Sequence, residues 1–148
     1  MKISIIIPVY NGEQYIRKCL DSVKKQTYPD IETVVINDGS TDGSEKVLKE
    51  YAAENPSMTI KIITKKNAGL PQARKTGVEN ASGDYIGFLD VDDWAEPQEY
   101  EEMAQKAIQK NADIVCCGYQ MDYGDRLQTV KQNLDPDKTY TGMEAFDF

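Results

Sequence analysis

Three aspartates fall within four positions directly behind an apolar run, in the sequence GFLDVDDW of residues 87–94. Neighbouring carboxylates repel one another, and this repulsion raises their pKa values unless a positive group lies between them. Asp90 and Asp92 are close enough in sequence to share one hard cation, and Mg²⁺ or Mn²⁺ typically binds one or two carboxylates together with phosphate oxygens. The pattern therefore predicts a divalent cation site for phosphate chemistry. The alternative is a solvated turn in which Asp93 caps the next helix.

Asp38 and Tyr10 also follow apolar runs, at positions where each could contact a nucleotide. The carboxylate of Asp38, beside Gly39, could accept hydrogen bonds from the N–H groups of a base or from a ribose hydroxyl. A turn residue that caps the following STDGS segment is the alternative. Tyr10 lies just beyond Pro8, and its ring could stack on a base; a core tyrosine is the competing interpretation.

Arg74 and Asn67 are weaker candidates. Arg74 lies in a predicted helix near the same edge and could meet a phosphate, although a solvated helix charge gives the same pattern. Asn67 and Gly69 suit a turn. Histidine is absent from the chain, which excludes Ser-His and Cys-His catalysis and the usual zinc sites. Carboxylates, hydroxyls and lysines remain for any chemistry.

The composition is that of an acidic globular domain of 148 residues with a formal net charge of -8. This charge argues against a protein that binds nucleic acids or anionic membranes in general. An apolar stretch of about 20 residues, as a membrane span needs, does not occur, and we expect no signal peptide. Three cysteines, two of them adjacent, argue against a disulfide framework. We therefore expect a cytoplasmic protein.

Apolar runs and helical spacings alternate along the chain and define the elements that must position these side chains. The runs predict strands at 2–9, 31–37, 59–64, 85–89 and 113–121. Apolar residues at helical spacing predict helices between consecutive strands. Alternation of this kind predicts an α/β fold with a mostly parallel central sheet and helices on both faces. Ligands bind such sheets outside the carboxyl ends of the strands, and the polar motifs PVYNGE, NDGSTDGS, KNAGL and DVDDW all fall there.

The last residues follow a different pattern. Residues 122–138 are polar and predict a hairpin or a loop, and TGME at 141–144 resembles a capping box that begins a helix. Because only about one turn follows, we expect that the chain has been cut there. We therefore divide the chain into a core at 1–123 and the start of a second region at 124–148.

The ordered motifs resemble those of family 2 glycosyltransferases, inverting enzymes of the Rossmann-like GT-A fold that use nucleotide-sugar donors. The resemblance rests on SIIIPVYNGEQYIRKCLDSVKKQTYPDIETVVINDGSTDGS, on KNAGLPQARKTGVENASGDYIGFLDVDD, and on their order, and it spans residues 1 to about 123. It implies transfer of sugar from a nucleotide-diphosphate donor, a UDP-sugar in our interpretation, with a Mn²⁺ or Mg²⁺ cofactor. The implied acceptor is a saccharide or lipid-linked saccharide, in bacterial cell-surface polysaccharide synthesis.

The resemblance also assigns roles to individual residues. It places Pro8 and Tyr10 in the base pocket, Asp38 on the base N–H, Asp92 on the metal, and Asp90 near the ribose or metal. Asn67 and Arg74 match a motif of the family without an assigned contact.

The family's catalytic base is an acidic residue well downstream, and nothing after Asp93 convincingly matches it; Asp135 and Asp137 lie in a polar loop without family context. We therefore expect the base beyond Phe148, no transfer by this stretch alone, and membrane association, if any, through a longer parent protein.

Four other functions are alternatives. A dinucleotide-binding domain needs a Gly-x-Gly-x-x-Gly turn after the first strand, and a sugar-nucleotide-synthesising nucleotidyltransferase needs a glycine- and arginine-rich loop there; PVYNGE is neither. A haloacid-dehalogenase phosphatase carries its FLDVD-like motif after the first strand and not the fourth. A module that binds nucleotide and metal without catalysis is the non-enzymatic alternative.

Overall fold

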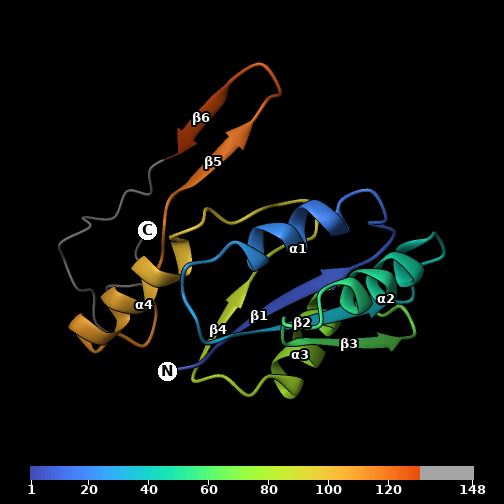
Figure 1. The fold of residues 1–148 in the computed structure, drawn as a ribbon, viewed down its shortest axis with the longest axis horizontal. Helices are drawn as coiled ribbons and strands as arrows, with labels where there is room; N and C mark the ends of the chain where they lie inside the picture. Colours follow the sequence, from blue (N-terminus) through green and yellow to red (C-terminus); the bar gives the residue numbers. More distant parts are fainter. Residues whose placement is uncertain (131–148) are drawn as a thin grey trace. The chain divides into compact units, whose positions relative to one another are not determined.

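The central sheet is built around β1 (Ile3–Val9), whose seven residues are all buried. In the computed structural model, which describes residues 1–130, β1 pairs in parallel with β2 (Ile31–Asp38) on one side and with β4 (Tyr85–Phe88) on the other. β3 (Ile60–Lys65) extends the sheet beyond β2, again in parallel. The strand order β3-β2-β1-β4 (Figure 1) confirms the first four expected strands and the parallel α/β sheet.

Helices cover both faces of this sheet. Ile6 of β1 and Ile36 of β2 pack with Ala73 of α3 (Leu70–Asn80) on one face. Because side chains alternate along a strand, Ile7, Val9 and Val35 point to the other face. There they lie with side chains of α1 (Ile16–Lys24) and α2 (Ser44–Glu54), namely Ile16, Cys19, Leu20 and Leu48. Burial of each such side chain contributes about 1.5–3 kcal/mol, so two apolar layers hold the sheet.

The amino ends of the strands are joined by one buried carboxylate. Glu32 accepts hydrogen bonds from the Ser4 hydroxyl of β1 and from the backbone N–H and hydroxyl of Ser82, and forms an ion pair of 2.9 Å with Lys2. Burial alone raises the pKa of Glu32, but these bonds outweigh it and lower the pKa to about 2. The Glu32 carboxylate therefore ties β1 and β2 to the segment that leads into β4.

Contacts divide the chain into two units, residues 1–100 and 101–148, and α4 (Glu99–Lys110) begins at the end of the first. In the second unit β5 (Tyr119–Asp122) and β6 (Leu127–Val130) form an antiparallel hairpin. A backbone hydrogen bond from Tyr123 to Arg126 closes its turn, and Gly124 has a positive φ of 83°. A hairpin or a loop is expected at 122–138; the structure has a hairpin there, but its first strand begins at Tyr119, before the expected range.

The fifth strand expected at 113–121 in the parallel sheet is wrong. Only Tyr119–Met121 of that range lie in a strand, and this strand pairs with β6. Cys116 and Cys117, which fall within the expected strand, are exposed and lie outside the strands. A short apolar run shows that a segment suits a strand, but its pairing partner depends on contacts that the run does not encode.

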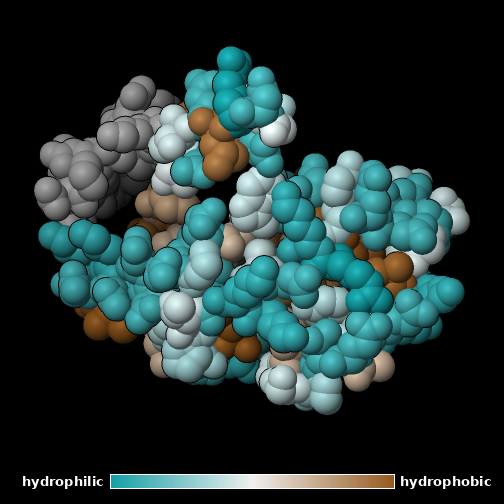
Figure 2. Space-filling model, turned by 45° about the horizontal axis from the view of Figure 1, so that its top comes forward, coloured by the Kyte–Doolittle hydropathy of each residue, from teal (hydrophilic) through white to brown (hydrophobic). Residues whose placement is uncertain are grey.

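The capping box expected at 141–144, Asp135 and Asp137 lie outside the described residues. The boundary expected after residue 123 stays a prediction. Among residues 1–130, no helix is long and apolar enough to cross a membrane. Figure 2 shows one face of the molecule, on which hydrophilic side chains predominate and hydrophobic ones form small separate spots.

Candidate functional site

Loops from four strand ends meet at the carboxyl edge of the sheet. The strand order reverses direction between β1 and β4, and α/β sheets bind ligands at such a switch point. The loop after β1 touches the loop after β4, since a Cβ on Gly12 would lie 2.9 Å from a methyl of Val91. The loop after β2 touches the turn after β3, since a Cβ on Gly39 would lie 2.7 Å from the backbone nitrogen of Asn67.

The loops after β1 and β2 are fastened to each other by reciprocal hydrogen bonds. Asn11 has a φ of 51°, a left-handed conformation that asparagine tolerates. Its side-chain oxygen accepts a bond of 2.8 Å from the backbone N–H of Thr41. Glu13 accepts from the N–H of Gly43 at 2.9 Å, while its own N–H donates to Asp42. These bonds fix the backbone that directly follows Tyr10 and Asp38.

Asp38 holds the turn between β3 and α3. Its side chain is only 4% exposed and forms an ion pair of 2.6 Å with Lys65, its register partner in β3. It also accepts hydrogen bonds from the backbone N–H groups of Ala68 and Gly69. Burial raises the pKa of Asp38, but the bonds from Lys65, Ala68 and Gly69 outweigh it and hold the pKa below its usual value. Both carboxylate oxygens are therefore engaged within the protein.

Arg74 connects α3 to the aspartate loop. Its guanidinium donates to Asp90 at 2.7 Å and lies 5.6 Å from the centre of the Phe88 ring. The clustered aspartates repel one another unless a positive group lies near them. Within residues 1–130, Arg74 is the positive group that pairs with Asp90.

The aspartates of this loop repel one another. Burial raises the pKa of Asp93, and the neighbouring charges of Asp92 and Asp90 raise it further. Burial and the same three aspartates raise the pKa of the Cys19 thiol to about 12. A divalent cation would relieve this repulsion, and carboxylate oxygens are ligands that Mn²⁺ and Mg²⁺ prefer. Asp92 is exposed and available as a ligand, so the donor set fits such a cation.

The cation would need ligands from elsewhere as well. Within residues 1–130, no group of three or more histidine, cysteine, aspartate or glutamate side chains is arranged to hold a metal ion. Two carboxylates completed by phosphate oxygens and water are the arrangement typical of Mg²⁺ in nucleotide sites.

Pro8, Tyr10 and Asp38, which were singled out from the sequence, follow the face of the sheet that α3 covers. Ile6 packs against α3, and alternation along β1 therefore directs Pro8 to the same face. Pro8 is the register partner of Ile36, and Asp38 lies two residues further along β2. Tyr10 continues this series beyond the strand and is 55% exposed, so its ring is available for stacking. Asn67 is exposed in the turn before α3.

Sequence reasoning missed three contributors to the site. Lys65 pairs with Asp38, and Asn11 and Glu13 fasten the first two loops. No local signal indicated Lys65, because its pairing with Asp38 depends on the register of β3 against β2. In a further contact, Lys18 of α1 lies 3.4 Å from the ring centre of Trp94, at the end of the aspartate loop.

Comparison with known protein families gives a match to the family described as glycosyl transferase family 2, over residues 4–146. A relative among curated proteins is "Glycosyltransferase GlyA" of Streptococcus pneumoniae, which is 48% identical over 118 residues. The match covers 80% of this chain and 17% of that protein. The chain spans less than half the length of curated relatives that it matches.

Solved structures of glycosyltransferases have the same fold. TarS of S. aureus in complex with UDP-GlcNAc is 31% identical and superposes with a TM-score of 0.70, over 76% of this chain and 33% of that one. The mannosyltransferase PcManGT of Pyrobaculum calidifontis, in complex with GDP-Man and Mn²⁺, is 25% identical with a TM-score of 0.67. That match covers 79% of this chain and 34% of the mannosyltransferase. The parallel sheet with flanking helices is therefore a GT-A fold.

Proposed function

The chain belongs to glycosyl transferase family 2, and from this premise we propose that it binds the nucleotide-diphosphate part of a UDP-sugar together with Mn²⁺ or Mg²⁺. The observation that carries the proposal is the convergence of four strand-end loops on one edge, with an acidic loop beside an arginine. TarS, which is similar to 76% of this chain, binds UDP-GlcNAc. Similarity to that complex favours UDP over other nucleotides.

The proposed roles are those that the family resemblance implies. Tyr10 stacks on the base with Pro8 beside it, and Asp38 accepts from a base N–H once a donor within the protein is displaced. Asp92 is the principal metal ligand and Asp90 lies near the ribose or the metal. Asn67 and Arg74 face the nucleotide from the turn and from α3. When bound, the cation supplies Lewis-acid stabilisation of the phosphate leaving group.

The activity of a longer protein is a further part of the proposal. Curated relatives are longer than this chain, and we propose for such a protein transfer with inversion to a saccharide or lipid-linked saccharide in cell-surface polysaccharide synthesis. The base that deprotonates the acceptor is proposed to lie outside residues 1–148. Loss of a general base typically costs about 10²–10⁴-fold in rate. Residues 1–148 should therefore bind donor and transfer sugar far more slowly than a protein that includes the base.

Calorimetric titration of UDP, with Mn²⁺ or with EDTA, tests donor binding directly. We expect tight binding with Mn²⁺ and weak binding in EDTA, because Asp90 and Asp92 repel the diphosphate when no cation lies between them. Asp92→Asn should remove the metal-dependent part of the affinity. The matched control is Asp113→Asn, which removes one aspartate charge from the second unit. Equal UDP affinity in Mn²⁺ and in EDTA for the unaltered chain would contradict the proposal.

A further inference from the structure

We propose that Arg74 is an exchangeable counter-ion, which neutralises Asp90 before the cation binds and donates to the diphosphate once the cation has taken Asp90. The inference rests on the proposed function and adds to it a coupling between cation and nucleotide. Arg74 is then a positioning residue for the donor. Three features of the arginine and its surroundings support the exchange.

The first feature is the geometry of the ion pair. One terminal nitrogen of Arg74 lies 2.7 Å from one oxygen of Asp90, and Arg74 forms no second ion pair within residues 1–130. A guanidinium carries five N–H donors in a rigid plane. The pair thus uses a minor part of the donors that Arg74 can offer to an oxyanion.

The second feature is an unsatisfied donor. The Nε atom of Arg74 is buried and donates to no acceptor within residues 1–130. A buried donor without a partner costs about 1–3 kcal/mol. A phosphate group placed beside Arg74 could satisfy Nε and a terminal nitrogen together, since guanidinium groups bind phosphate in this bidentate manner.

The third feature is the support that holds the guanidinium near the site whichever acceptor it has. Its central carbon lies 5.6 Å from the centre of the Phe88 ring, within the range of a cation–π contact. The side chain of Arg74 is 38% exposed and that of Asp90 is 40% exposed. Both groups are therefore accessible to a ligand, and the ring contact does not depend on Asp90.

These features make the cation and the arginine competitors for Asp90. The positive charge of Arg74 beside Asp90 opposes a divalent cation at the same carboxylate, so the cation should bind weakly when no nucleotide is present. A diphosphate offers Arg74 a second anionic partner and also supplies oxygen ligands to the cation. Cation and diphosphate should then strengthen each other's binding by the same factor, since linkage is reciprocal.

Arg74→Gln provides a test because it should change two affinities in opposite directions. Binding of Mn²⁺ alone, followed by electron paramagnetic resonance of the free ion, should become about tenfold tighter, because a like charge next to the site is removed. Binding of UDP in saturating Mn²⁺, followed by calorimetry, should become at least about tenfold weaker, because a charge-assisted bond is lost. A purely structural role for Arg74 predicts that both affinities fall.

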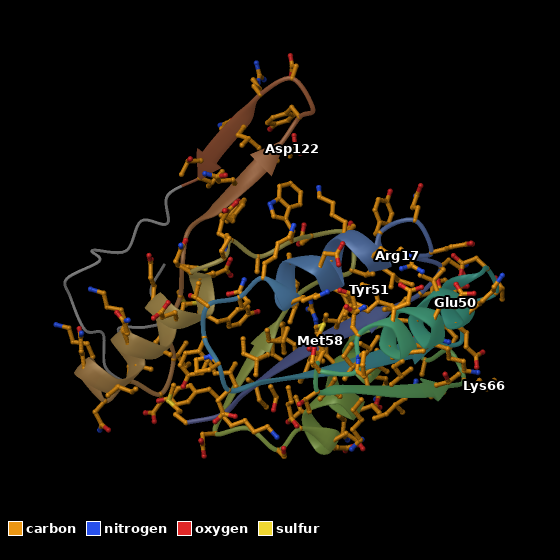
Figure 3. All side chains as sticks on the ribbon, viewed as in Figure 1. Arg17, Glu50, Tyr51, Met58, Lys66 and Asp122 are labelled. Carbon is orange, nitrogen blue, oxygen red and sulfur yellow. The ribbon has the colours of Figure 1, made fainter. Side chains whose placement is uncertain are left out.

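Arg17→Gln is the matched control. Arg17 in α1 also forms an ion pair of 2.7 Å, with Glu54, and lies over an aromatic ring, that of Tyr51 at 6.0 Å. Figure 3 shows Arg17 beside Tyr51 and Glu50 at the contact of α1 with α2. The control removes the same charge and the same type of pair, so both affinities should stay within twofold of the unaltered chain. Arg74→Lys should keep Mn²⁺ binding near the unaltered value and weaken UDP binding, since lysine keeps the charge without the fork.

The outcomes separate this inference from the proposed function. Metal-dependent UDP binding by the unaltered chain, combined with opposite changes in Arg74→Gln, supports the exchange. The same UDP binding combined with unchanged or weaker Mn²⁺ binding in Arg74→Gln overturns the exchange and leaves the proposed function standing. Absence of metal-dependent UDP binding in the unaltered chain contradicts the proposed function itself. Circular dichroism would show whether Arg74→Gln folds. If it does not, Arg74→Lys provides the test, and an unchanged UDP affinity in that variant would overturn the exchange.

Discussion

Asp38 has a structural role with which its proposed contact to a base must be compatible. Its oxygens accept from Lys65, Ala68 and Gly69 and so hold the turn that leads into α3. The proposed contact with a base N–H requires one of these donors to give way. Lys65 is the most suitable, because its ammonium group can also donate to the carbonyl of Lys66, at 2.9 Å.

We predict that Asp38→Ala weakens uridine binding by roughly 1–3 kcal/mol, because a base N–H is left without its acceptor. Fluorescence or calorimetric titration with uridine measures the change, at a temperature where circular dichroism shows the variant to be folded. Asp42→Ala is the control, since Asp42 also accepts from backbone N–H groups but in the adjoining loop. Unchanged uridine affinity in Asp38→Ala would mean that Asp38 serves the turn alone.

The types of the site residues could be predicted from the sequence, but most of their partners could not. Asp38, Tyr10, Arg74 and Asp90 stand out because each lies at a strand end or helix start that the apolar pattern defines. The pairs Asp38–Lys65 and Arg74–Asp90 join residues 27 and 16 positions apart. Such pairs depend on strand register and on helix placement, and the local pattern encodes neither.

At the scale of elements, α3 packs closely on β1 through one glycine. Gly77 is buried in α3, and a Cβ added there would lie 2.3 Å from Cγ2 of Ile6. Ile6 is fully buried at the centre of the sheet and cannot move away cheaply. This contact sets how closely the helix that carries Arg74 approaches the strand that leads to Tyr10.

We predict that Gly77→Ala lowers the free energy of unfolding by up to about 2 kcal/mol. Overpacking typically costs 1–3 kcal/mol, and the better helix propensity of alanine offsets about 1 kcal/mol of that cost. Urea denaturation measures the change, with Lys75→Ala on the exposed side of the same helix as the control. Combination with Ile6→Ala should cost less than the sum of the two single changes. A stabilised Gly77→Ala variant would show that the contact relaxes freely.

The four strands of the parallel sheet could be predicted from the sequence. The pairing partner of the strand after α4 could not. The runs that became β1, β2, β3 and β4 are bounded by turn residues and separated by helices, so the parallel arrangement follows from connectivity. After α4 the next strand can join the sheet or turn back on itself. The polar turn around Gly124 favours the second arrangement, and β5 pairs with β6.

At the scale of the whole molecule, the two ends of the sheet in the first unit differ in how their carboxylates are paired. The candidate site occupies the carboxyl ends, where negative charge is partly uncompensated. At the amino ends, Glu32 is compensated by Lys2 and by hydroxyl and backbone donors. A change at Glu32 should therefore affect global stability and leave the loops at the other end in place.

We predict that Glu32→Gln lowers the free energy of unfolding by roughly 3 kcal/mol at pH 7. The pKa of Glu32 falls from 4.5 to about 2 on folding, and each unit corresponds to about 1.4 kcal/mol. Because the folded-state pKa is the lower one, this stabilisation is complete above about pH 5 and is lost as the pH falls through 4.5 towards 2. Urea denaturation of both proteins at pH 7, 4.5 and 3 should show the difference between their free energies of unfolding roughly halved at pH 3.

Glu45→Gln, which breaks an exposed pair with Lys49, is the control, and its free energy of unfolding should differ from that of the unaltered chain by less than about 1 kcal/mol throughout. If the free energy of unfolding lost in Glu32→Gln does not depend on pH, the ionised carboxylate of Glu32 is not what stabilises the fold.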